Sequence, residues 1–216
     1  MTPVVAVDGP TASGKGTLAR RLAADLGFAY LDTGSLYRAT ALRLIRAGGD
    51  GSDVEAAVAA ARGITPDDLS DPALREEATG NMASKVAALQ PVRDALFAFQ
   101  QAFAATPPDG AAGAVLDGRD IGTVVCPDAT AKLFVTATAT ARAERRHAEL
   151  IARGTDVTLE NVLQDLRARD ERDINRATSP LKPAADADLL DTTELDIEAA
   201  FFAARKLVTA RLECQA

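Results

Sequence analysis

A glycine-rich segment near the N-terminus is the part of the sequence that most clearly carries chemistry. Residues 9–17 match the pattern G-x-x-x-x-G-K, with an apolar run before them and a helical pattern after them. Such a loop points backbone N–H groups at phosphate oxygens, and the helix N-terminus and Lys15 add positive charge. We expect ATP to bind to the whole segment, which consists of Gly9, Pro10, Thr11, Ala12, Ser13, Gly14, Lys15, Gly16 and Thr17.

One position of this loop departs from the usual pattern. A serine or threonine normally follows the lysine, and its hydroxyl contacts Mg²⁺. Here Gly16 follows Lys15, and Thr17 comes one residue later. We therefore expect Mg²⁺ to arrive bound to ATP and to have no direct ligand from the protein.

A helical pattern at 158–175 indicates a second site for an anion, because its inward stripe turns from apolar to charged. The apolar members of the stripe are Leu159, Val162, Leu163 and Leu166, and the charged residues that follow are Arg169, Arg172, Asp173 and Arg176. Burying unpaired charge is unfavourable, so these side chains must meet opposite charges or a ligand. The alternative is a solvated helix end in which Arg169 and Asp173 form an i,i+4 pair.

Two further polar clusters, at 32–38 and 117–122, directly follow predicted strands. Ligand clefts of open parallel sheets lie at the carboxyl ends of the strands, which favours a role for Arg38, Arg119 and Asp120 in a site. The alternatives are a helix start capped by Thr33 with a surface arginine, and a polar loop with local salt bridges.

Alternating strand and helix patterns must position these groups. Apolar runs predict strands at 3–8, 28–31, 114–117, 131–136 and 187–191. Helices are predicted from Lys15 to Leu26, from Thr33 to about Ala47, at 138–152 and 158–175, and after a cap at Thr192 or Thr193. Residues 53–105 read as mostly helical and are interrupted by Pro66, Pro72 and Pro91. This order predicts an α/β fold with a parallel sheet covered by helices on both faces.

Composition excludes several classes of function. The chain has 216 residues and a net charge of −7, which argues against a nucleic-acid binder. We expect no membrane association, because no apolar run reaches the roughly 20 residues of a bilayer span. The N-terminus has no signal-peptide pattern, so a cytoplasmic location is expected.

Cys126 and Cys214 are expected to be reduced thiols, and His147 to face solvent. We also expect a monomer.

The chain resembles the bacterial cytidylate kinases, which are nucleoside monophosphate (NMP) kinases of the P-loop NTPase class. The resemblance runs through nearly the whole chain and rests on D-G-P-x-x-x-G-K-G-T at 8–17, L-D-T-G-x-x-Y-R at 31–38, D-G-R-D-I-G-T-V-V-x-P-D-A at 117–129 and R-D-x-R-D-x-N-R at 169–176. It implies a three-layer α/β/α fold with a five-stranded parallel sheet, a helical NMP-binding insert and a short helical lid. The single kinase domain 1–216 would have its core at 1–47, 111–137 and 176–216, its NMP-binding region at 48–110 and its lid region at 138–175.

The same resemblance implies roles for individual residues. Arg38, Arg119 and Arg176 would bind the monophosphate, and Arg169 and Asp173 the sugar hydroxyls. Cytosine would be recognised by Ser84, Arg93 and Asp120. The implied CMP site is Thr33, Arg38, Ser84, Arg93, Arg119, Asp120, Arg169, Asp173 and Arg176, and the implied catalytic residues are Lys15, Arg119 and Arg176.

One region departs from the family. Between Ile64 and Ser84 the family commonly carries a longer insert with a small β-sheet, whereas this chain is short there and reads as helix and loop. This leaves open how well CMP is distinguished from dCMP or UMP.

The implied reaction is phosphorylation of CMP, and of dCMP, by ATP. Catalysis would depend on positioning and charge neutralisation, with a lid helix at 138–152 that carries Arg142, Arg145 and Arg146 and is followed by Arg153. The alternatives are a UMP/CMP or other small-molecule phosphotransferase on the same fold, and a regulatory nucleotide-switch ATPase, which would leave the arginine clusters without a role.

Overall fold

The core of the protein is a five-stranded parallel sheet. The computed structural model describes residues 2–65 and 67–214, so the predicted break at Pro66 lies outside the described residues. The strands are β1 (Val4–Asp8), β2 (Ala29–Asp32), β3 (Ala114–Gly118), β4 (Ala131–Thr136) and β5 (Asp188–Asp191). They lie in the order β2-β3-β1-β4-β5, and every neighbouring pair is parallel. The α/β class and the five-stranded parallel sheet predicted from the sequence are confirmed.

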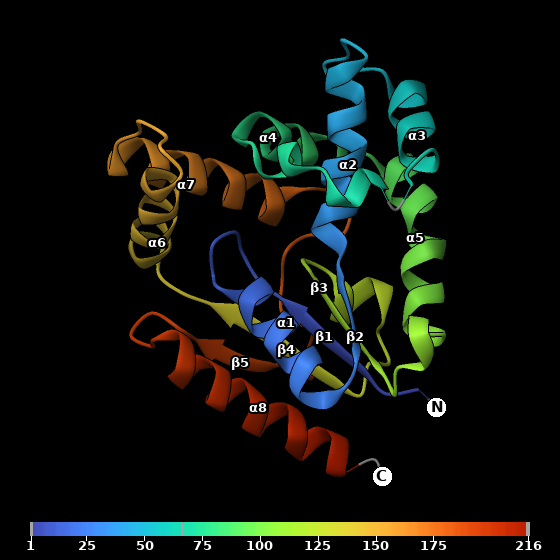
Figure 1. The fold of residues 1–216 in the computed structure, drawn as a ribbon, viewed down its shortest axis with the longest axis vertical. Coiled ribbons are helices and arrows are strands. Elements are labelled where there is room, and N and C mark those ends of the chain that lie inside the picture. The colour runs from blue at the N-terminus through green and yellow to red at the C-terminus, as the bar shows by residue number, and fades with distance from the viewer. Residues whose placement is uncertain (1, 66, 215–216) are drawn as a thin grey trace.

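Helices cover both faces of this sheet (Figure 1). On one face, α1 (Lys15–Leu26) and α8 (Ile197–Glu213) pack on β1, β3, β4 and β5 around Val5, Leu22 and Phe201. On the other face, α5 (Gln90–Ala105) and a π-helical turn (Ile121–Val125) pack around Leu116 and Ile121. The strands are apolar on both sides because both faces are buried, which is the pattern that predicted them.

The middle of the chain forms a separate helical layer, at the upper right of Figure 1. It contains α2 (Thr33–Arg46), α3 (Val54–Arg62), α4 (Glu77–Val86) and the N-terminal part of α5, with short 3₁₀ helices at Asp67–Ser70 and Pro72–Arg75. A third 3₁₀ helix, at Pro108–Gly110, lies between the C-terminal end of α5 and β3. Its apolar cluster includes Leu36, Val86 and Val92. The mostly helical character predicted for 53–105 is confirmed, and no strand occurs between Ile64 and Ser84 among the residues described there.

Two consecutive helices, α6 (Ala139–Ala152) and α7 (Leu159–Asn175), pack against each other at the upper left of Figure 1. Their small cluster contains Ala143, Val162 and Leu166, and Ala12 of the glycine-rich loop packs against it. We call residues 48–110 the acceptor region and 138–175 the lid region. These boundaries stay a prediction.

Two predicted helix caps are wrong. Asp32, and not Thr33, caps α2 by accepting from the N–H of Ser35 at 3.2 Å, while the Thr33 hydroxyl donates to the Asp117 carbonyl at 2.8 Å. At the other end of the chain, Asp196 caps α8 in place of Thr192 or Thr193. In both cases the threonine hydroxyl has another partner, and an aspartate nearby takes the capping position.

A buried aspartate at the end of β1 fixes the segment that follows β3. Asp8 is 4% exposed, and its two carboxylate oxygens accept from the N–H groups of Ile121 and Gly122, each at 2.8 Å. Burial raises the pKa of Asp8 to about 7, while these two N–H donors act in the opposite direction. The contact places Arg119 and Asp120 just beyond the strand end.

We predict that Asp8→Ala lowers the free energy of unfolding by about 2–6 kcal/mol, because two buried N–H donors lose their acceptor. Chemical denaturation monitored by circular dichroism measures this. Asp25→Ala is the control, since it removes only a surface ion pair with Arg205 and should cost about 1 kcal/mol or less. Equal losses in the two variants would contradict the account.

Candidate active site

The glycine-rich loop between β1 and α1 has the geometry of an anion site. Gly14 is the N-cap residue of α1 and has a φ of 85°. It has no side chain that could accept a hydrogen bond from the helix N-terminus. The first N–H groups of α1 therefore lack a capping side chain and can bind an anion. Gly9 has a φ of 154°, and a Cβ there would lie 2.0 Å from the Val135 carbonyl oxygen. Ala12 has a φ of 61°, so the loop also holds a non-glycine residue in the left-handed region.

Lys15 lies at the edge of this loop and is largely buried. Its side chain is 12% exposed, and its Nζ lies 3.7 Å from Asp117 Oδ1. Burial lowers the pKa of Lys15 to about 8, and the nearby Arg119 lowers it further, while Asp117 raises it. The ammonium therefore gains stabilisation when phosphate oxygens approach it.

The structure gives a steric reason why position 16 is a glycine. A Cβ at this position would lie 3.0 Å from Asp117 Oδ2, so the Asp117 carboxylate lies against the place where other P-loops carry a hydroxyl side chain. Tyr30 donates its phenolic hydroxyl to the same oxygen at 3.0 Å. The Asp117 carboxylate therefore supplies a hard oxygen ligand close to this point.

A cavity of about 240 Å³ opens beside Lys15. All nine residues expected for the acceptor site line it: Thr33, Arg38, Ser84, Arg93, Arg119, Asp120, Arg169, Asp173 and Arg176. They come from the loop after β3, from α2, α4, α5 and α7, and from the residue after α7. The structure thus brings together residues spread over more than half of the chain.

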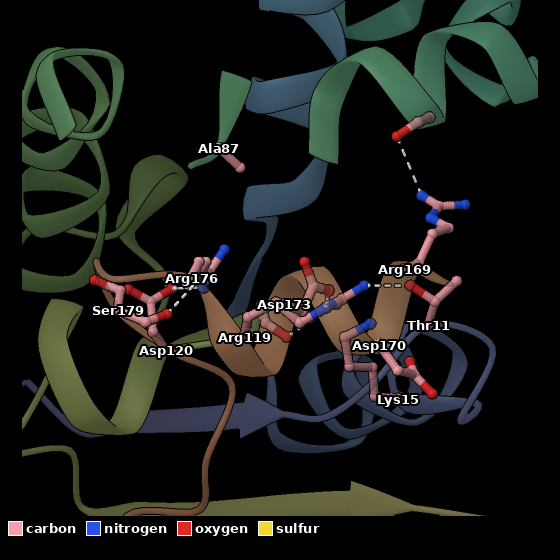
Figure 2. A network of polar contacts seen from close by, with 12 residues as sticks. Thr11, Lys15, Ala87, Arg119, Asp120, Arg169, Asp170, Asp173, Arg176 and Ser179 are labelled. Atoms are coloured by element: carbon pink, nitrogen blue, oxygen red, sulfur yellow. Dashed lines mark hydrogen bonds and ion pairs between the residues drawn. The ribbon is translucent and has the colours of Figure 1, made fainter. Parts of the chain in front are cut away.

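Arg119 joins the glycine-rich loop to the lid region. Its Nη2 donates to Thr11 Oγ1 at 2.7 Å and its Nε to Asp173 Oδ2 at 2.9 Å, and Figure 2 shows it between these two residues. Burial raises the pKa of Asp173, but the charge and hydrogen bond of Arg119, together with the charges of Arg176 and Arg169, hold it below its usual value. Arg119 therefore lies where it can contact both ATP and an acceptor phosphate.

A second group of charges lies at the far side of the cavity. Arg93 pairs with Asp120, and Arg176 Nη2 is 3.9 Å from the other carboxylate oxygen of Asp120. Arg176 Nη2 and Ser84 Oγ are buried but have no hydrogen-bond partner within the described residues. Buried polar atoms normally have partners, so these two atoms mark a place where a polar ligand fits.

The charged end of α7 is only partly as predicted. Arg169 and Asp173 are each 8% exposed, but Arg172 is exposed, so its predicted place on the inward stripe is wrong. Arg169 and Asp173 do not pair with each other, since Asp173 accepts from Arg119 and Arg169 contacts Glu77. Burial lowers the pKa of Arg169 to about 10.

The lid-region arginines have fixed partners. Arg142 is 5% exposed, donates to the Thr11 carbonyl at 3.0 Å and forms a bidentate pair with Asp170. Arg145 donates to Thr192, Arg146 pairs with Glu77, and Arg153 with Glu149. His147 is half-buried with its Nε2 at 3.0 Å from the Val157 carbonyl, so the expectation of a solvent-exposed histidine is wrong.

Several residues of the site were not predicted. Asp32, Asp117 and Tyr37 line the cavity, and Asp170 and Glu77 pair with lid arginines. Asp32 ends β2, Asp117 is the penultimate residue of β3, and both stand inside the motifs, which is a signal that could have found them. Asp170 also stands inside a motif, the one at 169–176, but Glu77 stands in none, and its partner Arg146 lies 69 residues away.

Comparison with known proteins identifies the family. The family model described as cytidylate kinase matches residues 5–201. The chain belongs to the cytidylate kinase family. It is 58% identical over 208 residues to the cytidylate kinase of Paramagnetospirillum magneticum, which covers 96% of this chain and 98% of that protein. The cytidylate kinase of Rhodospirillum rubrum is 55% identical over 201 residues, which is 93% of this chain and 94% of that protein.

These relatives bear on the short stretch before Ser84. Since both chains are covered almost completely, their lengths are nearly equal, which leaves little room for an additional insert in these relatives. The departure from the family expected at 64–84 is therefore not peculiar to this chain.

Solved structures of low sequence identity share the fold. An uncharacterised protein from Eubacterium ventriosum has a TM-score of 0.57 at 13% identity, covering 97% of this chain and 99% of that one. A sugar kinase from Janibacter has a TM-score of 0.50 at 15% identity, covering 97% of this chain and 95% of that one.

Within residues 2–65 and 67–214, none of the helices has the length and apolarity to cross a membrane.

We predict that ATP binding takes up a proton above about pH 8, because Lys15 has a pKa of about 8 in the ligand-free protein and phosphates raise it. The affinity for ATP should then fall about tenfold per pH unit above that value. Calorimetry in two buffers of different ionisation enthalpy measures the proton uptake. Lys15→Arg is the control, since a guanidinium stays charged at this pH and should take up none. The same uptake in both proteins would contradict the assignment.

Proposed function

We propose that the protein transfers the γ-phosphoryl group of ATP to the phosphate of CMP, and of dCMP, to give ADP and CDP or dCDP. The observation that carries this proposal is that one cavity contains both Lys15 of the glycine-rich loop and the arginines Arg38, Arg119 and Arg176. This supports the proposal, because transfer between two nucleotides requires their two phosphate sites to open into the same space.

In this proposal the acceptor needs no general base. A phosphate oxygen of CMP attacks the γ-phosphorus, the new P–O bond forms, and the bond to the β-phosphate oxygen breaks with its electrons leaving on ADP. Lys15 and Arg119 stabilise the negative charge that is spread over the transferring group. Because Arg119 donates to Thr11 of the loop, it is held in place before either nucleotide binds.

Magnesium fits this site as a companion of ATP. The carboxylates of Asp117 and Asp32 line the cavity beside Lys15, and carboxylate oxygens are ligands that Mg²⁺ prefers, directly or through water. When bound, the ion neutralises charge on the phosphates. That the protein supplies no direct ligand stays a prediction.

Cytosine recognition follows from the far side of the cavity. A carboxylate such as Asp120 accepts from the N4 amino group of cytosine, and donors such as Arg93 and the unpartnered hydroxyl of Ser84 serve its N3 and O2 acceptors. Uracil has a carbonyl in place of the amino group and an N–H at N3. It would leave these groups unpaired, a loss of at least about 1–3 kcal/mol.

Arg169 and Asp173 would contact the sugar hydroxyls, and closure of the lid region would exclude water from the reaction. A regulatory ATPase is not favoured, because it would leave the buried arginines of the acceptor side without a ligand. The cytoplasmic location and the monomeric state stay predictions from the sequence.

A coupled assay of ADP release with CMP, dCMP, UMP and AMP tests the proposal. We predict activity highest with CMP or dCMP and a catalytic efficiency roughly 5- to 150-fold lower with UMP. Activity highest with AMP would overturn the base assignment, and ADP release that does not depend on any acceptor would overturn the kinase assignment.

The same assay on Arg176→Ala tests the division into two phosphate sites. A lost charged hydrogen bond weakens binding by about 1.5–3 kcal/mol, so the KM for CMP should rise roughly 10- to 150-fold while the KM for ATP changes little. Arg172→Ala is the matched control, an exposed arginine near the end of α7 that should leave both constants unchanged. Equal changes for CMP and ATP in Arg176→Ala would contradict the assignment.

A further inference from the structure

A single carboxylate makes both ion pairs between the acceptor region and the lid region that the described residues contain. Glu77, the first residue of α4, accepts from Arg146 of α6 at 2.8 Å with Oε2 and from Arg169 of α7 at 3.4 Å with Oε1. Each oxygen therefore serves a different lid helix. Neither the sequence motifs nor the proposed reaction assigns Glu77 a role.

The guanidinium of Arg169 is confined where it meets α4. Its Nη2 donates to the Gly80 carbonyl at 3.2 Å, and a Cβ at Gly80 would lie 3.3 Å from the same nitrogen. The Arg169 side chain is 10% exposed. Because Arg169 also lines the acceptor cavity, Glu77 and Gly80 determine where this arginine stands relative to an acceptor nucleotide.

The other partner of Glu77 leads to the ATP side. Arg146 lies one helical turn after Arg142 on α6, and Arg142 is buried and donates to the Thr11 carbonyl of the glycine-rich loop at 3.0 Å. A continuous set of contacts therefore runs from the acceptor cavity through Arg169, Glu77 and α6 to the ATP loop. Glu77 is the member of this set that belongs to the acceptor region.

Glu77 is poorly suited to a purely stabilising role. Its side chain is 39% exposed, and ion pairs of exposed groups contribute little to stability. Its two arginine partners are much more buried, at 17% and 10% exposure, so the carboxylate orients two largely buried guanidinium groups, and one of them, Arg169, lies among other cations. Arg38 and Arg119 both lie close enough to Arg169 to disfavour its charge.

We propose that Glu77 is a positioning residue that couples occupancy of the acceptor pocket to ATP binding, by holding Arg169 and the lid helix α6 in one arrangement. The inference rests on the proposed function, because it takes CMP as the acceptor. When bound CMP restrains Arg169, Glu77 also restrains Arg146 and α6, because one carboxylate pairs with both arginines. The lid helix is then already positioned over the glycine-rich loop when ATP binds. Each nucleotide then tightens the binding of the other.

Calorimetry measures this coupling as the ratio of the Kd of a non-hydrolysable ATP analogue without CMP to that with saturating CMP. We expect a ratio of at least about five for the wild-type protein. Glu77→Gln, which keeps the shape and loses the charge, should bring the ratio close to one. Glu149→Gln is the matched control, because Glu149 pairs with the same Arg146 but within α6, and its ratio should stay at the wild-type value.

Two further variants keep the test decisive. Arg146→Met breaks the same link from the lid side and should lower the ratio as Glu77→Gln does. Thermal melting checks that each variant is folded, and if one of the two is not, the other still tests the link. Glu77→Asp retains the charge and should restore part of the coupling. A wild-type ratio of one, or a wild-type ratio that persists in Glu77→Gln, would overturn the inference.

The wild-type assay with CMP separates this inference from the proposed function. If the protein phosphorylates CMP but Glu77→Gln keeps the full coupling, only the role of Glu77 fails. If the wild-type protein phosphorylates no nucleoside monophosphate, the proposed function fails and the inference fails with it.

Discussion

Six cationic side chains converge on one cavity of a protein whose net charge is −7, and the site depends on how this concentration of charge is balanced. The six are Lys15, Arg38, Arg93, Arg119, Arg169 and Arg176. Burial lowers the pKa of Lys15 to about 8 and that of Arg169 to about 10, so the ligand-free arrangement is held against an electrostatic penalty. Asp117, Asp120, Asp173 and Glu77 offset part of it by direct pairing. The positive charge that these carboxylates leave unbalanced would be neutralised by the phosphates of the two nucleotides. This neutralisation is the physical basis of nucleotide affinity in the proposed reaction.

The parallel sheet places the balancing groups. In the register of the strands, Asp8 of β1 lies beside Gly118 of β3, and Asp32 of β2 lies beside Asp117. β1 and β2 thus end in a carboxylate, and β3 carries one at its penultimate residue, all at the edge where the glycine-rich loop also begins. Asp8 accepts hydrogen bonds from two backbone N–H groups and so stabilises the fold, whereas Asp32 and Asp117 line the cavity. The apolar clusters lie to either side and leave this edge free for polar chemistry.

The sequence predicted most of this architecture, and the failures have a common physical cause. The strands follow from short apolar runs, and the loop at 9–17 from its glycines and lysine, because these are local patterns. Six of the nine acceptor residues were first indicated by charged segments at the ends of a predicted helix and of predicted strands, and the family resemblance added Thr33, Ser84 and Arg93. The structure gathers all nine in one cavity, while their individual roles stay proposals. Thr33, Arg172 and His147 were misjudged because helical periodicity does not reveal which tertiary partner competes for a side chain. The pairs of Glu77 with Arg146 and of Arg142 with Asp170 join segments far apart in sequence, so no local pattern predicts them.

A crystal structure with CMP and a non-hydrolysable ATP analogue bound together tests the central claim most directly. The account predicts that the CMP phosphate lies against Arg38, Arg119 and Arg176, with one oxygen about 3–3.5 Å from the terminal phosphorus of the analogue and in line with the bond to be broken. The analogue's phosphates would lie on the N–H groups of residues 9–17 and on Lys15. A CMP phosphate bound elsewhere, with these guanidinium groups turned to solvent and away from the polyphosphate, would contradict the account.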